Sequence, residues 1–378
     1  MSDRKKITIL NFNISDNSLG RAYILGQALR ENYDVKILGP AIKGEVWSPL
    51  KNSGIEIIQL PYARIPFLFF TLPSILRAID GSLIYAVKPR FTSFGFALIK
   101  KFLAKTPVIL DIDDWEVGFY LKKGFFSRLL KFLNLSNPNG FFWTWCLQIF
   151  IPYADKITTV SKFLQDKYGG EIIPHAKDTG FLNPECFDKK HLKKQFNLED
   201  KKIVMFLGTP REHKGVEDLI NAVLMIEDAD LIVMVIGGNP SGEYERSLQN
   251  AGRKRLVMTG QIPYHELPGY LGAADVVVIP QRQTTDTVGQ IPSKIFDAMA
   301  MAKPIISTRV SDIPEILEGC GIIVSPGNVQ EISDALKWII NNPEKAYTMG
   351  LKAREKCIKH YSLQTIKGKL DRIVGVLI

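Results

Sequence analysis

The stretch Gln290-Ile-Pro-Ser-Lys-Ile-Phe-Asp-Ala-Met-Ala-Met-Ala-Lys-Pro-Ile-Ile-Ser-Thr308 joins a polar loop, a short helix and a buried strand. The first turn of the predicted helix carries Ser293, Lys294 and Asp297, and Pro304 opens the apolar run that follows. A helix N-terminus offers unpaired backbone N–H groups to an anion, and a carboxylate one turn further can hold two sugar hydroxyls. These are the contacts that a nucleoside diphosphate needs. The simpler alternative is an ordinary helix that is capped by Ser293, with Asp297 near the positive end of its dipole.

The same alternation of helices and short apolar runs extends over the whole chain. Strands are predicted at residues 7–11, 35–38, 55–59, 83–87, 108–111 and 157–160, and again at 203–207, 231–236, 256–259, 276–279, 305–307 and 321–324. Helices are predicted between several of them, at residues 21–31, 92–103, 216–225, 244–251, 265–273 and 329–341. Apolar strands with interleaved helices indicate parallel sheets that are covered on both faces. The fold class is therefore α/β, with two doubly wound, Rossmann-like domains that face a central cleft and meet near residues 172–175.

Length and composition agree with a two-domain globular protein. The chain has 378 residues, of which 46% are hydrophobic, and 378 residues exceed the usual size of one domain. The four cysteines and five histidines show no metal-ligand spacing, so no metal is expected. The charged start lacks the apolar region of a signal peptide, which predicts a cytoplasmic protein. Residues 1–175 hold 22 Lys+Arg against 14 Asp+Glu, whereas the rest holds 26 against 25, so an anionic surface would be met by the first half.

Residues 118–153 depart from the alternating pattern, because basic residues are mixed with aromatic and aliphatic ones. No charge occurs from Phe132 to Ala154, but polar residues at 134–140 interrupt that run, so a spanning helix is not expected. An interfacial segment fits better, with Lys122, Lys123, Arg128 and Lys131 directed towards anionic headgroups. The alternative is a buried helix pair with solvated lysines. An interfacial segment predicts peripheral association with the inner face of the membrane.

A basic loop follows the predicted strand at residues 203–207. Phe206-Leu-Gly-Thr-Pro-Arg-Glu-His-Lys-Gly215 ends that strand and delivers Arg211 and Lys214 before the next helix begins. Ligands of open α/β sheets bind at the carboxyl ends of strands. Two cations at such a place can neutralise a leaving diphosphate. A solvated loop with incidental charges is the alternative for this motif taken alone.

Several motifs of the second half occur in a fixed order. They are Gly208…Arg211-x-x-Lys214-Gly215, Val235-Ile-Gly-Gly238, Leu256-Val-Met-Thr-Gly260, Ala273-Ala-Asp-Val-Val-Val-Ile-Pro280 and Pro292-Ser-Lys-Ile-Phe-Asp-Ala-Met-Ala-x-x-Lys-Pro304. In order and spacing the series resembles the donor domain of family 4 retaining glycosyltransferases, the group 1 glycosyl transferases, which have the GT-B fold. The first half is similar more loosely, through the Gly-containing loop Asp16-Asn-Ser-Leu-Gly-Arg21 and the connector Ile173-Pro-His-Ala-Lys-Asp178.

The resemblance implies a role for individual residues. It implies an acceptor-binding domain at residues 1–174, a donor-binding domain at 175–360 and a C-terminal helix at 361–378 that packs back on the first domain. It assigns the donor diphosphate and nucleotide to Gly20, Gly208, Arg211, Lys214, Gly238, Ser293, Lys294, Ile295 and Asp297, with Asp297 on the ribose. The chain departs from the family at three positions. Gly289 stands where the family usually has a glutamate near the sugar, Asp297 stands in place of a glutamate at the ribose position, and Thr209 stands where many relatives have an arginine. Asp286 and Gln290 are predicted as the replacement sugar contacts.

The run Asp111-x-Asp113-Asp114 follows a strand of the first half. An Asp-x-Asp motif marks the metal–nucleotide site of the other large glycosyltransferase fold, but that fold has a single domain. Asp113 falls where the resembling family often has a histidine, so Asp113 and Asp114 are interpreted as catalytic residues that orient or deprotonate an acceptor hydroxyl. Their alternative is structural, with Asp111 capping a turn and Asp114 paired with a cation. Lys88 and Trp115 are predicted on the acceptor side, where Lys88 meets a phosphate or lies in a solvated turn.

Together these features predict a retaining glycosyltransferase that moves a sugar from a nucleotide-sugar donor to a hydroxyl of a lipid-linked or polysaccharide acceptor. The catalytic residues are Asp113, Asp114, Arg211 and Lys214, and neither a cofactor nor a nucleic acid is expected. A nucleotide-sugar epimerase of the same shape is the alternative among enzymes. A glycan- or nucleotide-binding relative that has lost catalysis is the alternative outside them.

Overall fold

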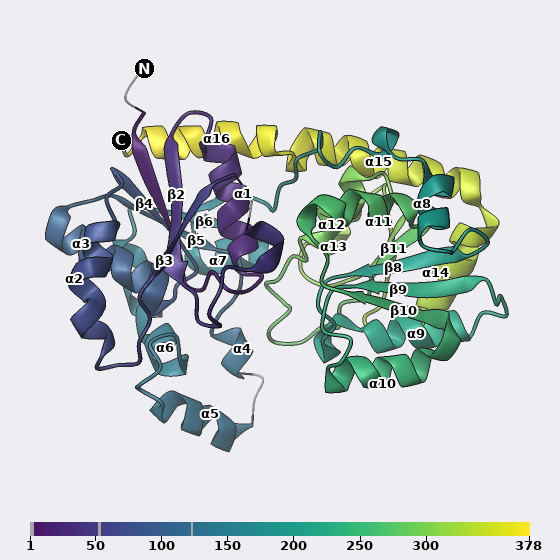
Figure 1. Ribbon diagram of the computed structural model, residues 1–378, viewed down its shortest axis with the longest axis horizontal. Coiled ribbons are helices and arrows are strands. Elements are labelled where there is room, and N and C mark those ends of the chain that lie inside the picture. Colours follow the sequence, from purple (N-terminus) through teal and green to yellow (C-terminus); the bar gives the residue numbers. More distant parts are fainter. Residues whose placement is uncertain (1–3, 52–53, 122–123) are drawn as a thin grey trace. The chain divides into compact units, whose positions relative to one another are not determined.

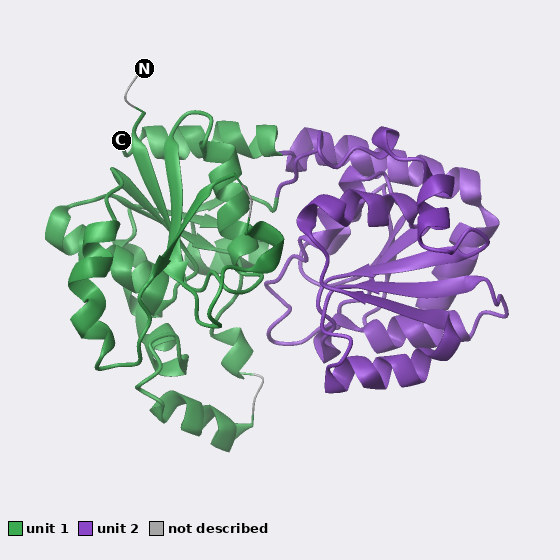
Figure 2. Cartoon of the chain, viewed as in Figure 1, with its two compact units in different colours: residues 1–175, 363–378 green, residues 176–362 purple. Residues whose placement is uncertain are grey.

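The computed structural model describes residues 4–51, 54–121 and 124–378 of the chain, which divide into two compact units (Figures 1 and 2). Unit 1 holds residues 1–175 and 363–378, and unit 2 holds residues 176–362. The division falls within the predicted connector, and the chain returns to unit 1 after Ser362. The last helix therefore belongs with the first half of the sequence, as its colour in Figure 2 shows.

Unit 1 is built on a seven-stranded parallel sheet in the order β3-β2-β1-β4-β5-β6-β7. Its strands are β1 (Lys6–Asn11), β2 (Asp34–Pro40), β3 (Glu56–Leu60), β4 (Leu83–Val87), β5 (Val108–Ile112), β6 (Lys156–Thr159) and β7 (Glu171–Ile172). Its helices are α1 (Leu19–Leu29), α2 (Leu68–Ala78), α3 (Phe96–Ala104), α4 (Gly118–Leu121), α5 (Phe125–Leu133), α6 (Phe141–Phe150), α7 (Lys162–Tyr168) and α16 (Leu363–Gly375). The sequence of β4, Leu-Ile-Tyr-Ala-Val, is buried at every position, as expected for a central parallel strand.

Unit 2 repeats this architecture with six parallel strands in the order β10-β9-β8-β11-β12-β13. They are β8 (Lys202–Leu207), β9 (Leu231–Ile236), β10 (Leu256–Gly260), β11 (Val276–Ile279), β12 (Ile305–Thr308) and β13 (Ile322–Val324). The helices are α8 (Lys189–Gln195), α9 (Val216–Leu224), α10 (Glu243–Gly252), α11 (Leu267–Ala273), α12 (Lys294–Ala300), α13 (Ile313–Leu317), α14 (Val329–Asn341) and α15 (Pro343–Tyr361). The prediction of two doubly wound parallel-sheet domains is confirmed.

Both sheets share one strand order, which puts their topological switch points at corresponding places. In unit 1 the order reverses between β1 and β4, and in unit 2 it reverses between β8 and β11. Helices lie on both sides of each sheet (Figure 1), so ligands of such a sheet bind beyond the carboxyl ends of the strands, at the switch point. In unit 2, the loops at this point are residues 208–215 after β8 and residues 280–293 after β11, and both carry predicted site residues.

Residues 118–153 form α4, α5 and α6, which end in a 3₁₀ turn at Ile151–Tyr153. None of the residues of α5 is buried, and the exposed fractions reach 79% at Phe126 and 72% at Leu130. In Figure 1, α5 lies apart from the sheet of unit 1, beyond α6. The alternative of a buried helix pair is therefore wrong for α5, whereas α6 buries Phe141, Thr144 and Leu147. Lys122 and Lys123 lie outside the described residues. Within the described part of the chain, no helix is both long and apolar enough to cross a bilayer.

Candidate active site

The loop after β8 brings a lysine over the carboxyl end of that strand. The Lys214 ammonium donates a hydrogen bond to the Thr209 carbonyl at 2.8 Å, and a Cβ atom added at Gly208 would lie 3.6 Å from this nitrogen. Arg211 lies in the same loop and is exposed. The loop therefore presents one half-buried and one exposed cation at the switch point of unit 2.

Gly215 and Gly238 allow the close backbone packing around this loop. At Gly215 the φ angle is +68°, and an added Cβ would lie 2.0 Å from the Pro280 carbonyl oxygen, so no other residue fits without movement. At Gly238 the φ angle is +80°, and an added Cβ would lie 2.7 Å from Pro210 Cδ. The loops after β8, β9 and β11 therefore meet within van der Waals distance, which fixes the position of the residues between Pro210 and Gly215.

Asp286, from the loop after β11, lies next to the same cationic loop. Its carboxylate is buried, accepts a hydrogen bond from Thr284 Oγ1 at 2.6 Å and lies 3.8 Å from His213 Nδ1. His213 directly precedes Lys214, so the structure brings Asp286 to the predicted diphosphate residues. Gln290 lies further along, in a turn that its own N–H closes by donating to the Thr287 carbonyl at 3.0 Å.

Helix α12 starts without the predicted cap. Ser293 has helical backbone angles and its side chain makes no capping hydrogen bond, so the alternative of a helix capped by Ser293 is wrong. The Ile295 N–H donates to the Pro292 carbonyl at 3.0 Å. The Lys294 ammonium lies 3.7 Å from an Asp297 oxygen, one turn further along the helix. The first turn therefore holds a cation and a carboxylate close together.

Asp297 is fully buried and forms an ion pair that the sequence did not reveal. Its Oδ1 atom lies 2.7 Å from the ammonium of Lys177, which is itself 5% exposed. Beyond ion pairs, neither oxygen accepts a hydrogen bond of good geometry within the described residues. A carboxylate with acceptor capacity left can take hydrogen bonds from two hydroxyls. Lys177 belongs to the predicted connector, and its partner lies 120 positions later, so no local pattern signals the pair.

In unit 1, the loop after β1 leads into the first turn of α1, which holds Gly20. No atom lies within 4 Å of a Cβ added at Gly20, so this backbone can be approached closely. The next residue, Arg21, forms two hydrogen bonds with the Asp111 carboxylate, at 2.7 and 2.9 Å, and both side chains are buried. Asp111 also accepts a hydrogen bond from Thr158 Oγ1 at 2.7 Å. Asp111 therefore joins α1, β5 and β6 rather than capping a turn.

Asp113 and Asp114 lie in a buried charged cluster around the Lys88 ammonium. This nitrogen lies 3.0 Å from an Asp113 oxygen, 3.0 Å from a Glu116 oxygen and in contact with Asp114. Arg90 contacts Glu116 and donates to the Asn139 carbonyl at 2.7 Å. Two cations thus face three carboxylates. The Lys88 side chain is only 6% exposed, so its ammonium is already surrounded by acidic groups at the place where an acceptor phosphate was predicted.

The cluster shifts the protonation equilibrium of its members. Burial raises the pKa of Asp113 to about 7, although the Lys88 ammonium acts in the opposite direction. Burial acts to lower the pKa of Lys88, but the three carboxylates outweigh it and hold this pKa well above its ordinary value. For Glu116, Arg90 and Lys88 overcome the effect of burial and lower the pKa. A carboxyl group with a pKa of about 7 is suited to take up and release a proton near neutral pH.

Trp115 lies between Asp114 and Glu116 in sequence, and its ring is held by residues of α7. The Lys167 ammonium lies 5.0 Å from the centroid of the indole ring, and the Phe163 ring centroid lies 5.7 Å away. Trp115 was predicted on the acceptor side, but its partners in α7 could not be foreseen from the sequence.

The chain is similar in sequence to known glycosyltransferases. Residues 201–342 match the family model described as glycosyl transferases group 1. The chain is 26% identical over 239 residues to the GDP-mannose-dependent alpha-(1-6)-phosphatidylinositol monomannoside mannosyltransferase of Mycolicibacterium smegmatis, a match that covers 59% of this chain and 62% of that protein. The putative colanic acid biosynthesis glycosyl transferase WcaI of Escherichia coli is 23% identical over 73% of this chain and 70% of its own. Other curated relatives are matched over only about half of their length.

The fold has solved counterparts over its whole length. The crystal structure of Anabaena Alr3699/HepE in complex with UDP and glucose superimposes with a TM-score of 0.76, at 18% identity, over 98% of this chain and 99% of that one. The matched family segment contains β8 to β13 and the loops after β8 and β11. Residues 201–342 are therefore a group 1 glycosyl transferase domain, and the chain that carries it has the GT-B fold.

Proposed function

We propose that this chain is a glycosyltransferase that transfers a sugar from a nucleotide-sugar donor to a hydroxyl group of an acceptor. The observation that carries the proposal is the placement of Lys214 and Asp286 on the loops at the switch point of unit 2, with the buried Asp297 on the helix that follows, all within the segment that matches the group 1 glycosyl transferases. The structure of Alr3699/HepE with UDP and glucose supports a nucleotide and sugar as ligands of this fold. We further propose retention of the anomeric configuration and no requirement for a metal.

In the proposed reaction, Lys214 and Arg211 stabilise the leaving nucleoside diphosphate. Negative charge develops on the diphosphate as the glycosidic bond breaks, and fixed cations at that position lower the barrier. Lys214 is held by the Thr209 carbonyl, so its charge is positioned before the donor binds. No catalytic metal is then needed to neutralise the diphosphate.

Asp297 and the start of α12 are proposed to hold the nucleotide. The Asp297 oxygens have acceptor capacity for the two ribose hydroxyls, and the Lys177 ammonium, 2.7 Å from Oδ1, holds the carboxylate in place. Of the N–H groups predicted around Lys294 and Ile295, that of Ile295 is bonded to the Pro292 carbonyl, so the N–H of Lys294 is proposed to face the phosphates. Gly208 and Gly238 leave room for the backbone to approach. Asp286 and Gln290, on the loop that replaces the usual glutamate, are proposed to contact the donor sugar.

The acceptor is proposed to bind to unit 1. Asp113, with its raised pKa, would accept the proton of the attacking hydroxyl, while Asp114 and Lys88 position it. The mannosyltransferase relative acts on a phosphatidylinositol monomannoside, and the WcaI relative is named for colanic acid biosynthesis. We therefore propose a lipid-linked or polysaccharide acceptor, met at the cytoplasmic face of a membrane through residues 118–153.

Release of nucleoside diphosphate from a panel of nucleotide sugars, with and without lipid extract, tests the function. Lys214→Ala should lower kcat/KM by at least ~100-fold while the unfolding transition stays in place, because one preorganised cation is lost from the transition state. Lys254→Ala, at an exposed lysine in the 3₁₀ turn that precedes β10, is the matched control and should keep wild-type activity. Near-normal activity of the Lys214 variant would refute the diphosphate role.

The products of the same assay separate the alternatives. A glycosylated acceptor supports the transferase, whereas a new nucleotide sugar without transfer identifies an epimerase. Nucleotide binding without turnover of any donor identifies a non-catalytic relative.

A further inference from the structure

A cavity of about 430 Å³ lies within unit 1, beside the charged cluster of Lys88. Its walls come from the segment after β5, from α6 with the 3₁₀ turn that follows, and from α7. They include Trp115, Val117, Trp145, Ile151, Lys167 and Tyr168. The volume is in the range of sites that hold a small organic ligand. Neither the family match at residues 201–342 nor the proposed donor site includes any of these residues.

The polar groups of the wall are largely bonded to one another. The Tyr168 hydroxyl donates to Gln148 Oε1 at 2.7 Å, and the Gln148 amide donates to the Thr144 carbonyl at 3.4 Å. Burial raises the pKa of Tyr168, so the hydroxyl stays protonated. A ligand in this cavity therefore meets aromatic faces and the aliphatic carbons of Val117 and Ile151. A free sugar, which needs many hydrogen bonds, is a poor match, and an apolar chain is a good one.

One positive charge stands at the mouth of the cavity. Lys167 is exposed, and its ammonium lies 5.0 Å from the Trp115 ring centroid and 5.7 Å from that of Tyr168. None of the described residues that line the cavity is acidic. An ammonium above two aromatic rings, with no acidic side chain among the described residues that line the cavity, attracts an anionic group to this mouth.

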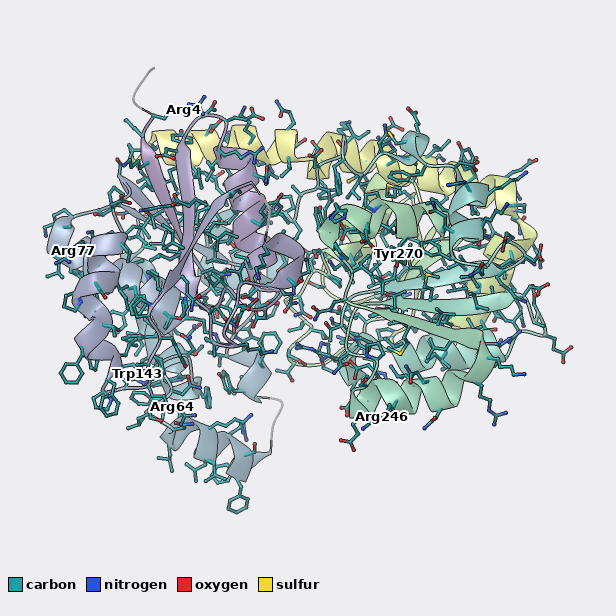
Figure 3. All side chains as sticks on the ribbon, in the orientation of Figure 1. Arg4, Arg64, Arg77, Trp143, Arg246 and Tyr270 are labelled. Atoms are coloured by element: carbon teal, nitrogen blue, oxygen red, sulfur yellow. The ribbon has the colours of Figure 1, made fainter. Side chains whose placement is uncertain are left out.

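The apolar wall continues onto the surface of unit 1. Trp145 lines the cavity and is 47% exposed, and the next turn of α6 carries Ile149 and Phe150 at 62% and 41% exposure. Figure 3 labels Trp143, another aromatic residue of α6. A chain longer than the cavity can therefore leave it along the exposed face of α6.

We propose that this cavity binds the apolar chain of a phosphate-bearing lipid, with the phosphate on Lys167 and the first carbons of the chain against Trp145 and Ile151. The inference rests on the proposed function and specifies its acceptor as a lipid phosphate ester rather than a free sugar. Trp115 joins the two sites, because it lines the cavity and separates Asp114 from Glu116 in the charged cluster. A headgroup bound at Lys167 would thus lie beside the proposed base.

Calorimetric titration of the full chain with geranyl phosphate, a short prenyl phosphate, tests the proposal. Saturable binding is expected, and geraniol, which lacks the phosphate, should bind about tenfold more weakly, as for loss of one charge-assisted contact. Lys167→Met should weaken geranyl phosphate binding to the same extent and leave geraniol binding unchanged. Trp145→Ala should weaken both ligands. The matched controls are Lys162→Met on the same helix and Trp338→Ala in unit 2, which should bind geranyl phosphate as the wild type does.

Absence of saturable binding, or equal binding of geranyl phosphate by the Lys167 and Lys162 variants, would overturn the proposal even if the Trp145 variant failed to fold. Donor turnover is measured on the same preparations. Donor turnover without lipid phosphate binding refutes the cavity alone. Lipid phosphate binding without turnover of any donor supports the proposed role of the cavity and refutes the proposed transferase function.

Discussion

The buried pair of Asp297 and Lys177 can be tested for a structural and a binding role separately. Asp297→Asn leaves the Lys177 charge buried and unpaired, so we expect a loss of about 3 kcal/mol in the free energy of unfolding, measured in urea. Combining it with Lys177→Gln removes both charges and should restore most of this loss. Nucleoside diphosphate binding should weaken in both variants, because the amide presents one acceptor oxygen to the two ribose hydroxyls where the carboxylate presents two. Nucleotide affinity that returned together with stability would reduce Asp297 to a structural residue.

The raised pKa of the Asp113 carboxyl group predicts how the activity depends on pH. Its pKa of about 7 means that the base form grows as pH rises, so kcat/KM should rise from pH 5 and level off above about 7. Asp113→Asn should abolish this rise of kcat/KM with pH. Asp155, a surface carboxylate paired with Lys101, provides the control, because Asp155→Asn should keep the rise. The pKa lies above the value near 4 of an unfolded chain, so the free energy of unfolding should fall as pH rises from about 4 to 7. A pH profile that is the same with and without Asp113 would remove it as the base.

At the scale of the element, substitutions in α5 and α6 should differ in how strongly they lower the free energy of unfolding. Replacing Phe126 and Leu130 of α5 by Ser should change the free energy of unfolding by less than about 0.5 kcal/mol per site, because neither side chain is buried. Leu147→Ala in α6 should cost about 2–5 kcal/mol, because that side chain is 6% exposed and its loss leaves a cavity. Urea unfolding measures both. Phe132 is the α5 residue whose ring meets those of α6, so a large loss from the Ser variant would mean that Phe126 and Leu130 also contribute to packing.

The strands could be predicted from the sequence because a parallel strand buried on both faces is a continuous apolar run, as in β9, Leu-Ile-Val-Met-Val-Ile. Helices with weak signals were missed. Pro73 lies inside α2, and α15 is polar enough that its apolar residues form no clear stripe. The cations of unit 2 could be predicted because their motif is local. The pairs Lys177–Asp297, His213–Asp286 and Arg21–Asp111 could not, because each joins positions that only the folded chain brings together.

At the scale of the whole molecule, the uneven charge predicts how the protein meets a membrane. Of the net charge of +9, residues 1–175 carry +8, and the same region displays the exposed aromatic side chains of α2 and α5. Basic residues near an anionic surface contribute roughly 1 kcal/mol each, and salt screens this attraction as the Debye length falls from about 10 Å at 0.1 M to 3 Å at 1 M. The full chain should therefore float with phosphatidylserine vesicles at low salt and lose most of this binding at high salt.

Two comparisons separate the electrostatic part of this binding from the apolar part. Vesicles of phosphatidylcholine alone should bind weakly at every salt concentration, because only apolar insertion remains. The variant with Ser at positions 126 and 130 should bind phosphatidylserine vesicles more weakly than wild type at low salt, yet keep the same salt dependence, because its charge is unchanged. Equal flotation with neutral and anionic vesicles would contradict the role of the basic first unit. Undiminished binding by the Ser variant would move the membrane contact away from α5.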